Sequence, residues 1–417
     1  MSVAAAPALQ ASRRARVPSR SAPAVVRVAI AGCGTVGSAL AELLLANGLP
    51  GHRRVEIVKV LVRDRARTRR VSLRPGGFTT SLAAFLTAPC DVVVEAMRGV
   101  EPARTIVAAA LVQGRRVVTA NKALIAAEGA SLANLAERFG GALDFEGAVG
   151  GCIPVVRALR SHAAGVGVTA IRGVLNGTAN FVLDRVALGS SPDDAIRDAQ
   201  AKGFAEADPG RDLDGRDAAN KVAILAWLAF GIAPHMLPVS RRPLDDALTL
   251  ASSARALGAR VIQFAECVRT ERGLIARVEP ALIGPSHDLA CATAEWNAVT
   301  IDSRSAGTIL FAGRGAGGHP TAGALHGDLG ASSAPLPRPH VVHVAGDDDR
   351  SLRWVIWTRA TDTDLGARIG STRDLERLQL TDGAWLLTFE STPALAEARR
   401  AALAEVATGV ALARDLR

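Results

Sequence analysis

Two lysines and one aspartate have the side-chain types and the sequence context for proton transfer. Lys122 directly follows the apolar run that ends VVTAN. Asp217 and Lys221 lie four residues apart at the start of DAANKVAILAWLAFG, so they share one face of the helix that this pattern predicts. Position alone is also compatible with a surface lysine at 122 and with an exposed ion pair at 217 and 221.

A lysine in such a site can give a proton to a hydroxyl group or take one from it. Burial and a second nearby cation both lower the pKa of a lysine towards neutral pH. If Lys122 and Lys221 converge on one hydroxyl, each ammonium lowers the pKa of the other, and Asp217 can orient both. The preceding segment EADPGRDLDG contains further acids but does not match the spacing of an EF-hand calcium loop, and by default it is a solvated loop.

Short apolar runs alternate with helical patterns in the first third of the chain. Strands are predicted over 25–32, 55–63, 91–97 and 115–120, and helices over 38–48 and 103–114. This alternation predicts a parallel, doubly wound sheet. Because ligands bind outside the carboxyl ends of such strands, Lys122 is placed for chemistry or for contact with a phosphate.

A GxGxxG motif lies between the first predicted strand and the first predicted helix. It comprises Gly32, Cys33, Gly34, Thr35, Val36 and Gly37. The glycines permit a tight turn, close approach of a pyrophosphate and close helix–strand packing, and the helix N-terminus offers N–H groups to phosphate. The second strand ends at Arg63-Asp64, where an arginine favours the 2′-phosphate of NADP and an acid favours NAD. The sequence favours NADP and leaves NAD open.

The pattern changes beyond about residue 150. A helix-rich stretch over 154–230 precedes alternating segments typical of an antiparallel sheet, and a Pro/Ser-rich linker over 331–339 precedes two further strands and a helix. We therefore expect an α/β protein with an N-terminal Rossmann dinucleotide-binding domain, an α+β second domain and a small C-terminal α+β unit. The expected units are a disordered basic extension (1–24), the Rossmann domain (25–150), a substrate-binding and dimerisation domain (151–312) and the C-terminal unit (340–417).

Composition narrows the classes of partner. The net charge of +9 is concentrated in part in the four arginines of residues 1–24, and no basic stripe is interleaved with aromatic residues, so no nucleic-acid partner is expected. No apolar run is long enough to span a membrane, so no membrane partner is expected either. The five cysteines form no CxxC pair, and their odd number favours a reducing compartment, the cytoplasm.

The chain resembles homoserine dehydrogenases over about residues 27–330, through motifs that occur in the order found in that family. The motifs are AGCGTVGS (31–38), VVTANKALIA (117–126), FEGAVGGCIPVVRALR (145–160), NGTANF (176–181), GFAEADPGRDLDGRDAANKVAILA (203–226) and GRGAGGHPTAGALHGDL (313–329). The resemblance implies NAD(P)-dependent interconversion of L-homoserine and L-aspartate 4-semialdehyde, in the biosynthesis of threonine, methionine and isoleucine. It also implies a homodimer.

The resemblance further implies roles for single residues. Lys122 and Lys221 match the two active-site lysines of the family, and Asp217 matches an aspartate near the reacting carbon. Glu206 and Asp212 match acids that hold the substrate and its ammonium. The loop that lines the substrate pocket in the family is matched here by Asn176, Gly177 and Thr178. The positions that hold a structural monovalent cation such as sodium in the family, partly by backbone carbonyls, are matched by Glu146, Val149, Gly151 and Ile153. The family's cofactor-binding positions are matched by Gly315 and Gly317, which lie in a segment (313–330) that returns to the Rossmann domain. Lys122 also matches a cofactor-binding position.

Two arginines depart from the family pattern near the expected cofactor. Arg98 stands where a glycine-glycine turn is usual, and Arg314 replaces a residue that is usually proline or small. They could strengthen NADP binding or obstruct it, which keeps a catalytically silent nucleotide-binding paralogue as an alternative. A related dehydrogenase of another amino or hydroxy acid is the second alternative. The C-terminal unit lacks a DRPGVLA-like turn, so we expect no threonine feedback and at most a degenerate ACT-like fold.

Overall fold

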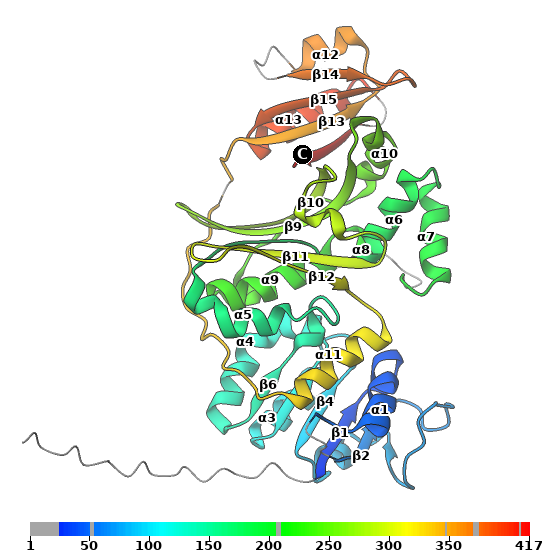
Figure 1. Ribbon diagram of the computed structural model, residues 1–417, viewed down its shortest axis with the longest axis vertical. Coiled ribbons are helices and arrows are strands. Elements are labelled where there is room, and N and C mark those ends of the chain that lie inside the picture. The colour runs from blue at the N-terminus through cyan, green and yellow to red at the C-terminus, as the bar shows by residue number, and fades with distance from the viewer. Residues whose placement is uncertain (1–24, 51–53, 206–209, 347, 370–374, 408–409) are drawn as a thin grey trace, which may run out of the picture.

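The computed structural model describes residues 25–50, 54–205, 210–346, 348–369, 375–407 and 410–417 (Figure 1). Two sheets dominate this part of the chain: a parallel sheet at one end of the molecule and a larger mixed sheet through the rest. The predicted α/β class is confirmed. The basic extension (1–24) and Glu206 lie outside the described residues. No helix among those described is both long and apolar enough to cross a bilayer.

The first sheet is parallel throughout and has the order β3-β2-β1-β4-β5-β6. Its strands are β1 (Val25–Ala31), β2 (Arg54–Leu61), β3 (Phe78–Thr79), β4 (Val92–Glu95), β5 (Arg116–Thr119) and β6 (Ala142–Asp144). Strands β2 and β3 are added on one side of β1, and β4, β5 and β6 on the other. The order in which strands are added therefore reverses between β1 and β4, and dinucleotides bind in the crevice at this point of the fold. The strands β3 and β6 were not predicted because two or three residues carry no periodic pattern.

Five helices cover the two faces of this sheet in the described part of the chain. They are α1 (Thr35–Asn47), α2 (Leu82–Leu86), α3 (Ala103–Val112), α4 (Lys122–Phe139) and, from much later in the sequence, α11 (Gly318–Gly330). Helix α11 lies beside α1 (Figure 1), and its Leu325 and Leu329 belong to the core around Ile30 and Leu40. The chain therefore leaves the first sheet and comes back to it.

The middle of the molecule combines a mixed sheet with helices. Its elements are α5 (Val155–Val166), β7 (Val168–Val174), α6 (Gly177–Ala187), α7 (Pro192–Ala201), α8 (Gly210–Leu213), α9 (Arg216–Phe230), β8 (Ser240–Arg241), α10 (Asp245–Ala254), β9 (Arg260–Thr270), β10 (Gly273–Ile283), β11 (Trp296–Ser303) and β12 (Gly307–Arg314). Strand β7 interrupts the stretch predicted as helix-rich. Helix α9 is buried along most of its length, and its Trp227 stacks on Phe145 at 5.7 Å between ring centroids, so α9 joins the two domains.

The C-terminal unit has the order β13 (Leu352–Thr358), α12 (Asp362–Ile369), β14 (Glu376–Gln379), β15 (Trp385–Ser391), α13 (Pro393–Ala404) and β16 (Ala411–Asp415). Its four strands lie in the order β16-β13-β15-β14, a βαββαβ arrangement. Strand β16 also pairs in parallel with β10, through Ala281 and Leu282. One continuous sheet therefore runs from β12 to β14.

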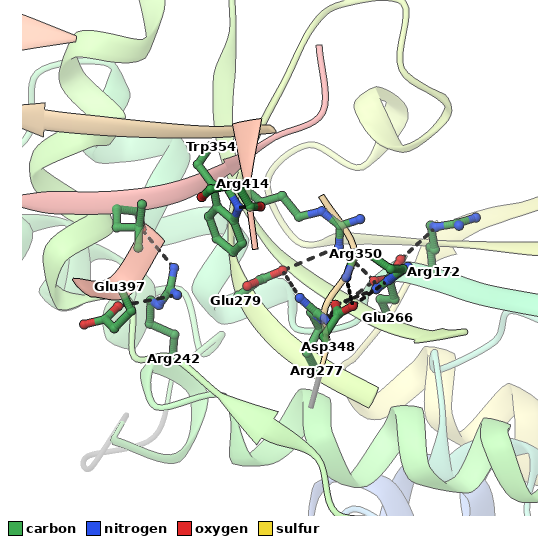
Figure 2. A network of polar contacts seen from close by, with 12 residues as sticks. Arg172, Arg242, Glu266, Arg277, Glu279, Asp348, Arg350, Trp354, Glu397 and Arg414 are labelled. Atoms are coloured by element: carbon green, nitrogen blue, oxygen red, sulfur yellow. Dashed lines mark hydrogen bonds and ion pairs between the residues drawn. The ribbon is translucent and has the colours of Figure 1, made fainter. Parts of the chain in front are cut away.

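Buried charges fasten this unit to the middle domain (Figure 2). Glu266 of β9 is fully buried and accepts hydrogen bonds from Arg414 at 2.8 Å, Arg350 at 3.1 Å and Arg172 at 3.1 Å. Burial alone would raise the pKa of the Glu266 carboxyl, but the surrounding guanidinium groups lower it to about 2. A carboxylate with this many partners keeps its charge, so the junction is held by ion pairs as well as by the shared sheet.

The segment 331–346 runs along the outside of both domains on its way to the C-terminal unit (Figure 1). The Pro337 carbonyl accepts a hydrogen bond from the Trp227 indole at 3.1 Å, and the Gly231 carbonyl accepts one from the His340 N–H at 3.0 Å. The Leu274 N–H donates to the His343 carbonyl at 2.9 Å. The Pro/Ser-rich linker is thus bound to the surface of the protein over much of its length.

Candidate active site

The structure brings together the three residues that the sequence selected for proton transfer. The Asp217 carboxylate forms ion pairs with the ammonium groups of Lys122 and Lys221, one on each oxygen. The Lys221 pair measures 2.8 Å, and the same ammonium donates to the Leu175 carbonyl at 2.6 Å. The two lysines come from different domains, so the carboxylate lies where these domains meet.

Local structure fixes the direction of each side chain. The Asn121 side chain caps α4 by accepting from the Leu124 N–H at 3.1 Å, which places Lys122 on the first turn, directly after β5. Asp217 lies in the first turn of α9, where the helix dipole favours a negative charge. Lys221 follows one turn later on the same face and is buried.

The electrostatics of the three groups depend on burial. The Asp217 and Lys221 side chains are 5% and 7% exposed, whereas Lys122 remains 43% exposed. Burial alone would raise the pKa of the Asp217 carboxyl, but the two ammonium groups hold it well below its ordinary value. Asp217 is therefore a fixed negative charge, and Lys122 is the most solvent-exposed member of the trio.

The residues of the NGT motif lie next to this carboxylate. The Asn176 side chain donates to Asp217 Oδ2 at 3.0 Å and caps α6 by accepting from the Ala179 N–H at 2.9 Å. Gly177 begins α6 in contact with the Glu295 carbonyl, which leaves no space for a Cβ atom, and Thr178 donates to the Phe204 carbonyl at 2.7 Å. Asp212 lies on α8, but its side chain is outside what the structure describes.

The glycine loop has the geometry that a dinucleotide needs. Gly32 has φ +95°, and a Cβ atom on it would meet the Ala96 carbonyl at 2.8 Å. A Cβ atom on Gly37 would lie 2.0 Å from the Gly32 carbonyl oxygen. Around Gly34, by contrast, no atom of the described residues lies within 4 Å of the Cβ position, so this side of the loop is open to an approaching group at the start of α1. Cys33, Thr35 and Val36 complete the loop.

The return segment lies against the same loop. A Cβ atom on Gly318 would meet the Thr35 side chain at 2.8 Å, and Gly317 has φ +115° at the start of α11. Gly315 is buried between the Gly151 turn and the side chain of Asn297. The two glycines expected near the cofactor, Gly315 and Gly317, are therefore on the segment that connects the glycine loop to the middle domain.

The arginines expected near the cofactor lie on exposed segments. Arg63 and Asp64 follow β2, whose Leu61 carbonyl accepts from the Gly32 N–H at 3.0 Å, and Asp64 accepts from the Ala66 N–H at 2.8 Å. Arg98 is exposed in the turn after β4. Arg314 is 68% exposed and faces Glu295 at 3.8 Å. The ion pairs of the Asp217 carboxylate are with Lys122 and Lys221.

The four residues matched to a monovalent cation lie on one turn. Glu146 begins a 3-10 helix (Glu146–Ala148), Val149 directly follows it, and Gly151 has φ +60° before Ile153. Both Glu146 carboxyl oxygens accept backbone N–H groups at the start of α5, at 2.8 and 2.9 Å. Burial raises the pKa of this carboxyl to about 7. No group of three or more histidine, cysteine or acidic side chains suited to a metal occurs among the described residues.

Glu95 was not selected from the sequence, although it lies at the carboxyl end of β4 beside the crevice. It is fully buried, accepts from the Met97 N–H at 2.7 Å and from the Thr119 hydroxyl, and lies 3.4 Å from the Asn121 amide nitrogen. Burial raises its pKa to about 7. A charged residue closing the apolar run VVVE was the available signal.

A nucleotide-binding loop at the switch point of a parallel sheet, together with a Lys–Asp–Lys cluster built from two domains, is typical of a nicotinamide-dependent oxidoreductase. A model of the family described as homoserine dehydrogenase matches residues 154–329, and one of its NAD-binding domain matches residues 32–146. The chain belongs to the homoserine dehydrogenase family. Its activity is that of an oxidoreductase acting on a CH–OH group with NAD(P).

Individual relatives agree with this placement. A homoserine dehydrogenase from Synechocystis sp. is 37% identical over 313 residues, which cover 73% of this chain and 72% of that protein. One from Mycobacterium tuberculosis is 44% identical over 247 residues, 57% of this chain and 56% of that protein. The crystal structure of a homoserine dehydrogenase from Thiobacillus denitrificans matches with a TM-score of 0.82 at 28% identity and covers 94% of this chain and 98% of that one.

Proposed function

We propose that Lys122, Asp217 and Lys221 carry out the proton transfer when this enzyme interconverts L-homoserine and L-aspartate 4-semialdehyde. The observation that supports this assignment is the buried Asp217 carboxylate, which binds ammonium groups from both domains at the crevice. Because Lys122 is the most exposed of the three, the substrate hydroxyl reaches the cluster from its side. Asp217 keeps the two lysines in place during the reaction.

The chemistry divides between the cofactor and the protein. The nicotinamide ring, when bound, accepts the hydride in alcohol oxidation and supplies it in aldehyde reduction. In oxidation, the hydroxyl proton passes to the amine of Lys221, and in reduction the ammonium returns it to the developing alkoxide. Lys122 stabilises the partial negative charge on the same oxygen.

The remaining polar residues hold the ends of the substrate. Asn176 is oriented by its bond to Asp217, and we assign it, with Gly177 and Thr178, to the pocket beside the reacting carbon. Glu206 and Asp212 are assigned to the substrate ammonium from the family motif. N–H groups at the start of a helix suit the substrate carboxylate.

We infer that NADP is the preferred cofactor. The open face of Gly34 at the N-terminus of α1 fits the pyrophosphate. Arg63 is exposed at the end of β2, whereas the Asp64 carboxylate accepts an N–H group of its own loop. A homologous archaeal homoserine dehydrogenase was solved in complex with NADPH, at a TM-score of 0.61 and 25% identity. Replacing Arg63 by alanine should weaken NADP much more than NAD in fluorescence titrations, and equal losses would contradict the assignment.

We also propose a structural monovalent cation at Glu146, Val149, Gly151 and Ile153. Both carboxyl oxygens of Glu146 accept N–H groups, so we assign the cation chiefly to backbone carbonyls of this segment, which suit a singly charged ion. Thermal unfolding after exhaustive dialysis, with and without added sodium, tests the proposal. An unchanged midpoint would reject it.

A homodimer and a cytoplasmic location complete the proposal. Strand β12 ends the large sheet, and its Ile309 and Leu310 are 40% and 44% exposed, which is unusual for an edge strand that stays uncovered. All five cysteines are free thiols, as expected in a reducing compartment. Light scattering of the purified chain measures its mass in solution, and a monomer would refute the dimer.

One experiment tests the assignment of activity and of Lys221 together. NADPH binding is titrated by fluorescence, and homoserine oxidation is then measured for the natural chain and for Lys221→Ala. We expect turnover by the natural chain, and nucleotide affinity nearly intact with turnover abolished in the variant. Binding without turnover by the natural chain would favour a silent paralogue, turnover only on another alcohol would favour a related dehydrogenase, and retained activity in Lys221→Ala would refute its role.

A further inference from the structure

A buried amide that belongs to none of the family motifs lies directly behind Lys221. Asn297, on β11, is fully buried, and its Nδ2 donates to the Leu175 carbonyl at 3.0 Å. The same carbonyl accepts the Lys221 ammonium at 2.6 Å. One backbone oxygen therefore holds both side chains, and a shift of Leu175 would move the ammonium with it.

The other side of this amide touches the cofactor segment. A Cβ atom on Gly315 would lie 2.0 Å from Asn297 Cγ, so the amide packs flat against the backbone of that glycine. A Cβ atom on Gly151 would in turn meet the Arg314 carbonyl at 2.7 Å. Gly315 is thus fixed on both sides, and one of its two neighbours is the amide that holds Leu175.

The orientation of the amide is set by its surroundings. Because Leu175 offers only a carbonyl, Asn297 must turn its NH₂ group towards it, and Oδ1 is then buried without a hydrogen-bond partner among the described residues. A buried polar atom without a partner lowers stability. An apolar residue would avoid this cost, so the amide is favoured for what Nδ2 does.

We propose that Asn297 is a positioning residue, which holds the Leu175 carbonyl and through it the Lys221 ammonium at a fixed distance from the segment around Gly315. The proposal rests on the proposed proton transfer by Lys221. It adds that one side chain, Asn297, places both Lys221 and the segment around Gly315, although these lie about a hundred residues apart in the sequence.

The matched control is a second buried asparagine with the same chemistry. Asn180, on α6, is also fully buried, donates to the Ala292 and Ala294 carbonyls at 2.9 Å, and has an Oδ1 without a partner among the described residues. The Lys221 ammonium donates to the Leu175 carbonyl instead. Asn180→Ala and Asn297→Ala therefore remove the same group from equally buried sites, and only the second touches the support of the lysine.

The test measures kcat, KM for homoserine, NADPH affinity and the midpoint of thermal unfolding for both variants. We expect Asn297→Ala to lower kcat about 10- to 100-fold, as a displaced catalytic group does, with NADPH affinity changed less than about 3-fold. Asn180→Ala should lower the midpoint similarly and leave kcat within about 2-fold. Equal effects of the two variants on kcat would overturn the proposal.

A third variant keeps the size of the side chain. Asn297→Asp replaces the donor by a carboxylate beside the Lys221 ammonium, which favours the protonated lysine, so homoserine oxidation should need a higher pH to reach half of its maximum rate. An unshifted pH profile in a folded Asn297→Asp protein would contradict a positioning role. Lys221→Ala, measured in the same assay, tells failure of the proton-transfer assignment from failure of the positioning role. If Lys221→Ala stays active, the proton-transfer assignment is wrong. If it is inactive and the Asn297 variants behave otherwise than expected, only the role of Asn297 is rejected.

Discussion

Replacing Glu95 by glutamine should make the protein more stable at alkaline pH. Glu95 is fully buried at the end of β4, and burial raises its pKa from 4.5 to about 7, although the bonds from Thr119, Met97 and Asn121 favour its charged form. In the unfolded chain the same carboxyl loses its proton near 4.5. The folded protein therefore binds one proton more than the unfolded chain over the interval between these two values.

This interval fixes the sign and the size of the effect. The contribution of a group with a raised pKa is complete below its unfolded value and is lost as the pH rises through its folded value. A shift from 4.5 to about 7 corresponds to about 3 kcal/mol at roughly 1.4 kcal/mol per pKa unit. The free energy of unfolding should fall by that amount between about pH 4.5 and pH 7 on account of Glu95. Glutamine does not ionise, so Glu95→Gln removes this loss.

Urea unfolding of both proteins between about pH 5 and about pH 8 measures the effect. Glu146 also has its pKa raised to about 7, but it is present in both proteins and its contribution cancels in the difference. The control is Glu137→Gln, since Glu137 is exposed and Arg338 holds its pKa below the ordinary value. The advantage of Glu95→Gln over the natural chain should grow with pH, whereas a constant or shrinking advantage would refute the burial argument.

Two further substitutions test the charge networks. Asp217→Asn takes away the carboxylate shared by two ammonium groups, so kcat should fall about 100-fold or more. NADPH should still bind in a fluorescence titration. A kcat within a few-fold of that of the natural chain would show that the lysines keep their places without this carboxylate. Glu266→Gln leaves buried guanidinium groups without a balancing charge and should cost about 3–5 kcal/mol in urea unfolding at neutral pH, whereas a loss below about 1 kcal/mol would mean that the sheet alone holds the C-terminal unit. In the natural chain, this contribution of Glu266 should disappear as the pH falls from 4.5 towards 2, because its pKa is lowered to about 2.

The parts of the site that the sequence indicated are those whose function depends on local geometry. Glycine positions in the loop 32–37 follow from a tight turn and a helix start, which are properties of adjacent residues. Asp217 and Lys221 share a helix face because they are four apart. The contact of Lys122 with this pair required the position of β5 in the first sheet and of α9 against it, which no local pattern contains. The family motifs supplied that connection.

The features that the sequence did not indicate depend on neighbours distant in the chain. Glu95 and Asn297 are buried polar residues whose partners come from other strands, so their environment exists only after the sheets have formed. The continuity of the large sheet from the middle domain to the C-terminal unit rests on two residue pairs between β10 and β16. Such short pairings leave no mark in the hydrophobic pattern of either strand.

Asp217 and the Leu175 carbonyl, two partners of Lys221, respond differently to its charge. This difference affects proton transfer in both alcohol oxidation and aldehyde reduction. The Asp217 carboxylate favours the ammonium form, because it gains an ion pair that the neutral amine does not make. The Leu175 carbonyl accepts an N–H from either form. When the lysine has given up its proton, the ion pair weakens and the carbonyl remains as its anchor. The position of Leu175 therefore decides whether the amine stays within reach of the hydroxyl for the next transfer, and Asn297 is the side chain that holds it.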